Sequence, residues 1–281
     1  MKNILIPTDF SENSWNAITY GMELFKKSKC TFYLIHVNPI KSYSGGESTV
    51  FIAPEIIEET ILKETTEQLQ KLLKDIEHLP FNTKHTFHTM AFYGFFTDHI
   101  QKEVKDNNID LIIMGTKGAT GLKAVAIGSN TGNVIAKIKC SILVIPENTV
   151  FRKPKEIGFP TDFKIEYNLK ILAHLKDIAL LNNSAIRFLY VVLHGADFNV
   201  LQNNNKELLA TNFKGVEHSF HKITGEKLET SIVCFTESRA LDMVVMITKN
   251  LNFLERFFIR PTVEKISYQT TTPLLVLHES E

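Results

Sequence analysis

The sequence predicts an α/β protein made of two tandem domains, each with a five-stranded parallel sheet flanked by helices. Short β-branched runs alternate with longer amphipathic segments, which is the pattern of β-α-β units in a parallel sheet. This pattern occurs twice, because residues 4–10 (ILIPTDF) return as residues 157–163 (IGFPTDF) with five of seven positions identical. A chain of 281 residues has room for two such domains of about 140 residues each.

The first half contains every element of the predicted unit. We expect strands near residues 3–7, 31–37, 84–90, 109–115 and 141–146. Helices are expected between them near residues 12–28, 54–78, 95–107 and 129–138. Ser11 is a suitable N-cap for the first helix, and Pro54 suits the first turn of the second.

The second half repeats this order. A second internal match joins residues 114–117 (MGTK) to residues 246–249 (MITK). The expected strands lie near residues 156–160, 185–193, 216–222, 242–247 and 273–277. The region after the second of these strands is short and rich in asparagine, so the helix that follows it should be reduced.

The boundary between the halves is expected near Pro146 and Pro154, where the pattern changes. The predicted domains are residues 1–148 and residues 153–281. Two fused copies of one unit can pair inside the chain as a pseudo-symmetric dimer, and a further homodimer of whole chains is a possible assembly.

Charge and hydrophobicity exclude some classes of partner. Lys plus Arg equals Asp plus Glu at 31 each, so the chain lacks the overall positive charge that non-specific binding to nucleic acid or to an anionic membrane requires. Pro7 and Asp9 interrupt the first apolar stretch, and no later run reaches the roughly 18 apolar residues of a spanning helix. We therefore expect a cytoplasmic protein without nucleic acid or membrane partners.

The three cysteines predict neither disulfides nor a metal site. Cys30, Cys140 and Cys234 lie in apolar runs and show no CxxC pairing. Buried free thiols in a reducing compartment explain them best.

A glycine-rich segment follows the fourth predicted strand. Gly115 and Gly118 precede nine intervening residues, and Gly128 and Ser129 then open a predicted helix. Glycines allow several backbone N–H groups to approach a phosphate, and a helix N-terminus adds free donors and a favourable dipole. A single glycine is usually only a turn or a cap, but this order of strand, glycines and helix favours a phosphate loop. It is neither a Walker loop nor a GxGxxG motif.

This segment, with the strand near residues 141–146 and the opening sequence ILIPTD, resembles the ATP-binding branch of the universal stress protein family. The resemblance implies a Rossmann-like fold of the adenine nucleotide alpha hydrolase type. It also implies ATP, or ADP or AMP, as the ligand, with Mg²⁺ bridging the phosphates. The residues implied in binding are Pro7, Thr8, Asp9, Val37, Met114, Gly115, Gly118, Gly128, Ser129 and Asn130.

Within that set the implied roles differ. Asp9 would contact the ribose or the adenine side, and the backbone of Val37 would bind the adenine edge. Asn130 stands where the family usually has an apolar or small residue, although a backbone N–H contact would survive this difference. Asp9 has an alternative role as a cap for the helix near Ser11. Lys117 and Lys123 are either phosphate partners or ordinary solvated lysines.

The second half lacks the phosphate loop. Aligning the fourth strands places Ile247, Asn250, Arg260 and Pro261 where the first half has Gly115, Gly118, Gly128 and Ser129. Asp162 remains, but alone it forms no nucleotide site. The apolar run at residues 251–259 is expected to pack within the chain or between its halves, the alternative being a contact with a separate partner.

No catalytic or metal-ligating set of residues is apparent. His85 and His88, like His218 and His221, should point to opposite faces of their strands, so neither pair can share a metal. The leading hypothesis is a nucleotide-binding stress-response regulator. The alternatives are an interaction module whose loop stays empty, or a slow ATPase. A nucleotidyl-transferring relative is disfavoured, because residues 7–11 (PTDFS) stand where a Ser-Gly-Gly-x-Asp-Ser loop is expected.

Overall fold

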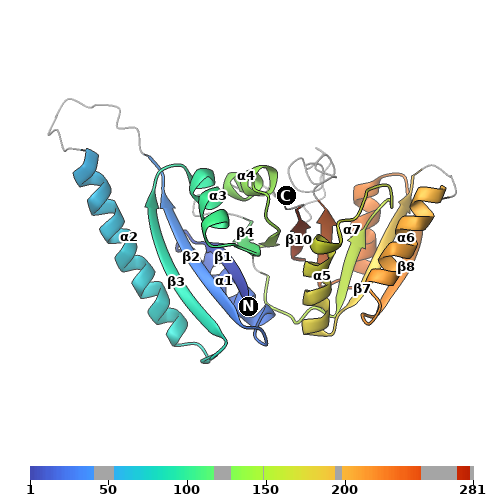
Figure 1. Ribbon diagram of the computed structural model, residues 1–281, viewed down its shortest axis with the longest axis horizontal. Coiled ribbons are helices and arrows are strands. Elements are labelled where there is room, and N and C mark those ends of the chain that lie inside the picture. Colours follow the sequence, from blue (N-terminus) through green and yellow to red (C-terminus); the bar gives the residue numbers. More distant parts are fainter. Residues whose placement is uncertain (41–53, 117–127, 148, 194–197, 248–270, 279–281) are drawn as a thin grey trace.

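The computed structural model places all ten predicted strands in one continuous sheet (Figure 1). It describes residues 1–40, 54–116, 128–147, 149–193, 198–247 and 271–278. The strand order is β3-β2-β1-β4-β5-β10-β9-β6-β7-β8. Each half therefore contributes five neighbouring strands, and the predicted α/β fold of two tandem units is confirmed.

The first half follows the expected alternation closely. Its elements are β1 (Lys2–Pro7), α1 (Glu12–Leu24), β2 (Cys30–Asn38), α2 (Pro54–Glu77), β3 (His85–Tyr93), α3 (Phe96–Asp106), β4 (Leu111–Gly115), α4 (Ser129–Lys137) and β5 (Ile142–Ile145). Ser11 is the N-cap of α1, and its hydroxyl accepts a hydrogen bond from the N–H of Ser14 at 3.2 Å. Pro54 is the first residue of α2, as predicted.

In the described residues of the second half, the strands follow the same order as in the first half. Its elements are β6 (Glu156–Pro160), α5 (Leu169–Asn182), β7 (Ala185–Val192), α6 (Val200–Asn212), β8 (His218–Thr224), α7 (Leu228–Ser238), β9 (Met243–Ile247) and β10 (Leu274–Leu277). The reduced second helix is confirmed, because α6 has 13 residues where α2 has 24. The apolar run at residues 251–259 lies outside the described residues.

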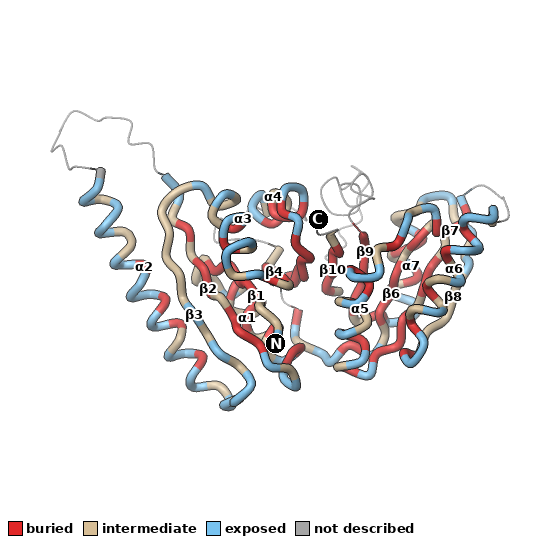
Figure 2. The backbone as a smooth tube through the Cα atoms, viewed as in Figure 1, coloured by how far each residue is buried: buried red, intermediate tan, exposed pale blue. Residues whose placement is uncertain are grey.

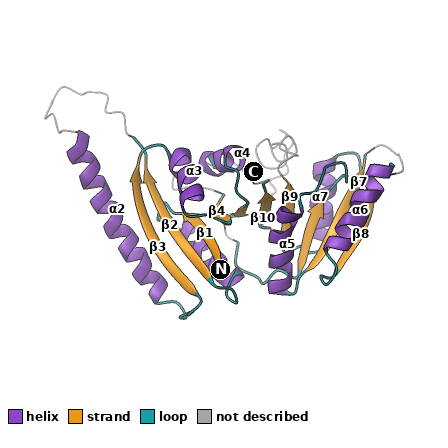
Figure 3. Ribbon diagram, in the orientation of Figure 1, coloured by secondary structure: helices purple, strands orange, loops and turns teal. Residues whose placement is uncertain are grey.

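The two halves join through an antiparallel pair of strands. All the other paired strands run parallel, but β5 and β10 run antiparallel, with Leu143 opposite Leu275. The direction of pairing thus reverses at this seam, and Figure 3 shows the two halves on either side of it, with β2 and β3 on one side and β7 and β8 on the other. This seam gives the two units an approximate twofold relation.

Two apolar cores cover the two faces of the sheet. One contains buried side chains of α1, α2, α5 and α6, and the other contains side chains of α3, α4 and α7. Both cores include residues from both halves. Burial is greatest in the central strands, whereas the outer face of α2 is exposed (Figure 2).

The three cysteines were expected to be buried free thiols, and two of them are. Cys30 and Cys140 are buried free thiols, and burial raises their pKa values to about 11 and about 12. The expectation for Cys234 is wrong, because it is exposed. It lies on α7 between buried Ile232 and Phe235, and an apolar run in a helix turns some of its residues outward.

The histidine pairs lie on opposite faces of their strands, as predicted. His85 is close to the ring of Phe32 in one core, whereas His88 stacks on Tyr33 beside the other. Within the described residues, no group of three or more His, Cys, Asp or Glu side chains could hold a metal ion. Nor does any helix in those ranges have the length and apolar character needed to cross a membrane.

Candidate functional site

The candidate site lies where the chain order of the strands reverses. In the first half β1 has β2 on one side and β4 on the other, so the connections leave β1 in opposite directions. Ligands of open α/β sheets bind beyond the carboxyl ends of the strands at such a switch point. Three residues of the predicted set, Pro7, Val37 and Met114, lie at or near these ends.

A tight turn after β1 forms one wall of the site. Thr8 is buried, its N–H donates to the carbonyl of Ile35 at 2.8 Å, and its hydroxyl is 3.0 Å from that of Ser14. Asp9 Oδ1 accepts hydrogen bonds from the N–H of Ser11 at 3.1 Å and from its hydroxyl at 2.5 Å. Asp9 therefore orients Ser11, which is the residue that caps α1.

Phe10 and His36 belong to the same wall and were missed by the sequence analysis. Phe10 has φ of 62°, a left-handed conformation that is unusual for a bulky residue. Its ring lies 4.8 Å from the imidazole of His36, whose Nδ1 is 2.7 Å from the carbonyl oxygen of Thr8. The repeated Thr-Asp-Phe was the available signal, since Phe163 in the second half has φ of 57°.

Gly115 allows close contact between β4 and the start of α1. A Cβ atom at this position would lie 2.5 Å from Nδ2 of Asn13. The carbonyl oxygen of Gly115 also accepts a hydrogen bond from the hydroxyl of Thr131 in α4 at 2.8 Å. The glycine thus brings the first turns of two helices to the end of one strand.

A hydrogen bond joins the two residues that flank the glycine-rich loop. The N–H of Gly128 donates to the carbonyl oxygen of Thr116 at 2.5 Å. Gly128 is the N-cap of α4, and no side chain in the described part of the chain caps this helix end. Ser129 and Asn130 follow in the exposed first turn. The helix N-terminus, with its partial positive charge, is therefore held beside the end of β4.

The structure brings together nine of the ten predicted binding residues. Pro7, Thr8 and Asp9 follow β1, Val37 is in the adjacent β2, and Met114, Gly115, Gly128, Ser129 and Asn130 surround the end of β4. Gly118 lies outside the described residues, as do Lys117 and Lys123. The arrangement offers backbone donors and a helix dipole, which suit an anionic ligand.

The equivalent position in the second half has a different structure. Gly115 pairs with Ile145 as Ile247 pairs with Leu277, so a buried isoleucine stands in the place of Gly115. The described part of this half confirms that exchange. Asn250, Arg260 and Pro261 lie outside the described residues.

The turn after β6 is covered by side chains of its own half. Phe163 is buried and contacts the ring of Phe198 at 5.4 Å. Amide groups of α6 donate to this turn, from Gln202 to the carbonyl of Asp162 and from Asn205 to that of Phe163, both at 2.8 Å. The second half therefore retains the turn but closes it, whereas Phe10 in the first half is only partly buried.

Fold and site define an α/β protein with a glycine-rich helix N-terminus at the switch point of its sheet. Comparison with protein families finds that the model of the universal stress protein family matches residues 1–146. The chain belongs to the universal stress protein family.

Individual relatives agree with this assignment. Universal stress protein MJ0531 of Methanocaldococcus jannaschii is 31% identical over 155 residues, covering 55% of this chain and 84% of that protein. Universal stress protein Slr1230 of Synechocystis is 25% identical over 300 residues and covers 98% of this chain and 99% of its own length. A crystal structure of a universal stress protein from Archaeoglobus fulgidus has the same fold, with a TM-score of 0.71, 18% identity and 99% of this chain covered, as well as 97% of its own.

Proposed function

We propose that this universal stress protein binds one adenine nucleotide, ATP or else ADP or AMP, in its first half (residues 1–148) and acts as a stress-response regulatory protein. The second half (residues 153–281) binds none. The observation that carries the proposal is the hydrogen bond from Gly128 to Thr116, which holds the N-terminus of α4 beside the end of β4. Phosphate groups bind at such helix ends.

The donor set fits a nucleotide phosphate chain. The first turn of α4 offers backbone N–H groups that no described side chain caps, and the hydroxyl of Ser129 adds a donor. Asp9 and the backbone of Val37 are assigned to the ribose and adenine sides. Mg²⁺, when bound, would neutralise charge between phosphates, a role in which it keeps several waters and needs few protein ligands.

Helix α1 offers a physical connection from this site to the second half. Its Asn13 touches Gly115, and one turn later Nδ2 of Asn16 donates to the carbonyl of Thr149 at 2.8 Å. Thr149 in turn donates its hydroxyl to the carbonyl of Thr271 at 2.9 Å. A nucleotide that favours one position of α1 would thereby favour one packing of the two halves. This is how occupancy would regulate a partner.

We also propose that the protein is cytoplasmic and that whole chains can form a homodimer, as expected from the sequence. Neither is needed for nucleotide binding.

A calorimetric titration of nucleotide-free protein with magnesium ATP tests the proposal. We expect one site per chain, because the second half has Ile247 in place of Gly115 and α6 covers the turn after β6. Two sites per chain would contradict the assigned asymmetry. No binding of ATP, ADP or AMP would favour an interaction module whose loop stays empty. Turnover that requires magnesium would instead favour the ATPase alternative.

A further inference from the structure

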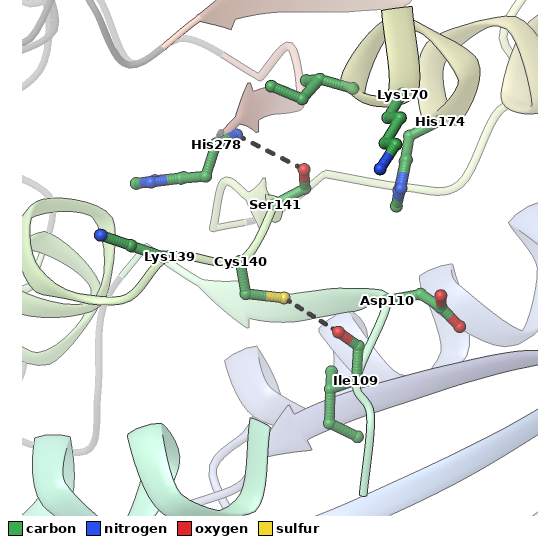
Figure 4. A pocket seen from close by; sticks show the side chains of 9 residues that line it. Ile109, Asp110, Lys139, Cys140, Ser141, Lys170, His174 and His278 are labelled. Carbon is green, nitrogen blue, oxygen red and sulfur yellow. Dashed lines mark hydrogen bonds between the residues drawn. The ribbon is translucent and has the colours of Figure 1, made fainter. Parts of the chain in front are cut away.

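A cavity of about 190 Å³ lies between the two halves, away from the nucleotide site. One side is formed by residues at the amino ends of β4 and β5, and the other by the first turns of α5 and the end of β10 (Figure 4). Its polar lining residues are Asp110, Lys139, Ser141, Lys170, His174 and His278. None of them belongs to the predicted nucleotide site.

The approximate twofold relation of the halves gives this cavity a counterpart. Strand pairing makes Met114 equivalent to Met246 and places Thr271 at the position of Lys139. The buried faces of α1 and α5 match when Ala17 and Ile18 are aligned with Ile171 and Leu172. Under that alignment the counterparts of Lys170 and His174 are Asn16 and Tyr20.

The segment that links the halves contacts this counterpart. Thr149 bonds to Asn16 through its carbonyl at 2.8 Å and to the carbonyl of Thr271 through its hydroxyl at 2.9 Å. The ring of Phe151 packs edge-on against Tyr20 at 5.0 Å. One of the two equivalent grooves is therefore filled by the chain itself, with contacts that are neutral and partly apolar.

The other groove, which is the cavity of about 190 Å³, has different charges along its lining. Neutral Asn16 and Thr271 are replaced by Lys170 and Lys139, so the exchange adds two positive charges. Among the described residues, no ion pair reaches Lys170 and no hydrogen bond reaches the ring of His174. Figure 4 shows both side chains extending from α5 toward the residues of β4 and β5. The space into which they project is equivalent to the space that Thr149 and Phe151 fill in the counterpart groove.

The described side chains that line the groove include two lysines and one carboxylate. Burial lowers the pKa of His174, and it lowers the pKa of His278 to about 4, so both rings are neutral near pH 7. Asp110 supplies one negative charge against the two lysines, and Oδ2 of this carboxylate already accepts a hydrogen bond from the N–H of Asn3 at 2.7 Å. From the described residues, Ser141 Oγ receives a long contact of 3.5 Å from the N–H of His278, and its own proton remains for donation.

We propose that this cavity binds a small anion carrying a phosphate or carboxylate group. Lys170, the hydroxyl of Ser141 and an imidazole N–H of His174 act as donors, and Lys139 adds positive charge. Charge-assisted hydrogen bonds of this kind are the strong ones in proteins. The volume of about 190 Å³ is below the roughly 300 to 1,000 Å³ of pockets for drug-sized ligands, which favours a small anion over a nucleotide.

An NMR titration of the full chain tests this inference independently of nucleotide binding. Sodium phosphate and sodium succinate are added separately at pH 7 and constant ionic strength, with chloride as the reference. At least one anion should shift the backbone amide signals of residues 139–141 and 170–174 and reach saturation. A response to phosphate alone identifies a phosphate site, and a response to succinate alone identifies a carboxylate site. No saturable shift with either anion would overturn the proposal.

Two variants separate this site from other cationic positions. Lys170→Gln should weaken the responding anion about tenfold, since it removes one charge-assisted hydrogen bond. Lys63→Gln, an exposed lysine of α2, is the matched control and should change nothing. Equal effects of the two variants would show that the anion is attracted only by overall charge, and the proposal would be wrong.

A third variant distinguishes this cavity from the start of α4, which also attracts phosphate. Ser129→Asp places a negative charge at that helix end. The signals of residues 139–141 and 170–174 should still respond to the anion in this variant. Loss of the response with Ser129→Asp but not with Lys170→Gln would assign the anion to α4 and overturn the inference.

Discussion

Replacing Ser129 by aspartate should weaken adenine nucleotide binding about 100-fold without weakening the fold. Ser129 is the exposed first residue of α4, where the phosphates are assigned. A carboxylate about 5 Å from a phosphate charge costs about 3 kcal/mol at an effective dielectric constant of 20, which corresponds to about 100-fold in affinity. The same charge interacts favourably with the N-terminus of the helix, so the free energy of unfolding should stay the same or rise slightly.

Ser129→Asn is the matched control for this measurement. Asparagine has nearly the shape of aspartate but no charge, so calorimetry should show a loss of affinity of no more than about fivefold, the effect of a single neutral hydrogen bond. Thermal unfolding of both variants checks that the fold is intact. If the aspartate and asparagine variants bind equally well, the phosphates do not lie at the start of α4, and the proposed site is wrong.

Leu275→Ala should destabilise the whole chain by about 3 kcal/mol rather than the second half alone. Leu275 lies in β10 opposite Leu143 and is fully buried. Removing a buried leucine side chain costs about 2 to 5 kcal/mol, because transfer free energy is lost and a cavity remains. The core around Leu275 contains residues of both halves, so the loss is shared between them.

Urea unfolding measured by two probes tests this cooperativity. Trp15, the single tryptophan, packs against the shared core from the first half, and far-UV circular dichroism follows both halves. The two transitions should coincide in the natural chain and move together in Leu275→Ala. Leu180→Ala, at a half-exposed position of α5, is the control and should cost less than about 1 kcal/mol. If Trp15 fluorescence does not respond to Leu275→Ala, the halves unfold independently.

The order of the elements could be predicted from the sequence because it depends on local patterns. Alternating apolar runs, the cap at Ser11 and the proline at position 54 act over a few residues, and each was found where expected. The joining of the two sheets into one could not be predicted in the same way. Nothing local in residues 142–145 or 274–277 shows that these strands pair with each other, because the pairing depends on the packing of both halves.

The candidate site was predictable to a similar extent. The glycines of the loop and the repeated Thr-Asp-Phe pointed to the edge of the sheet at which β1 and β4 end. The left-handed conformation of Phe10 and the hydrogen bond from Gly128 to Thr116 depend on backbone geometry that residue types do not specify. The covering of the turn after β6 by α6 was also not apparent, because asparagines in a short segment indicate a turn as readily as buried amide donors.

The antiparallel seam has a consequence for what this architecture can hold. When two identical subunits meet across a twofold axis, every substitution appears on both sides of that axis, so the two grooves beside it must remain alike. A chain that contains both copies is free of this restriction. Here one groove has become the place where the copies are tied together, through Thr149 and Phe151. The other is lined by Lys170 and His174 and remains a cavity. A symmetric scaffold thereby carries two unlike surfaces.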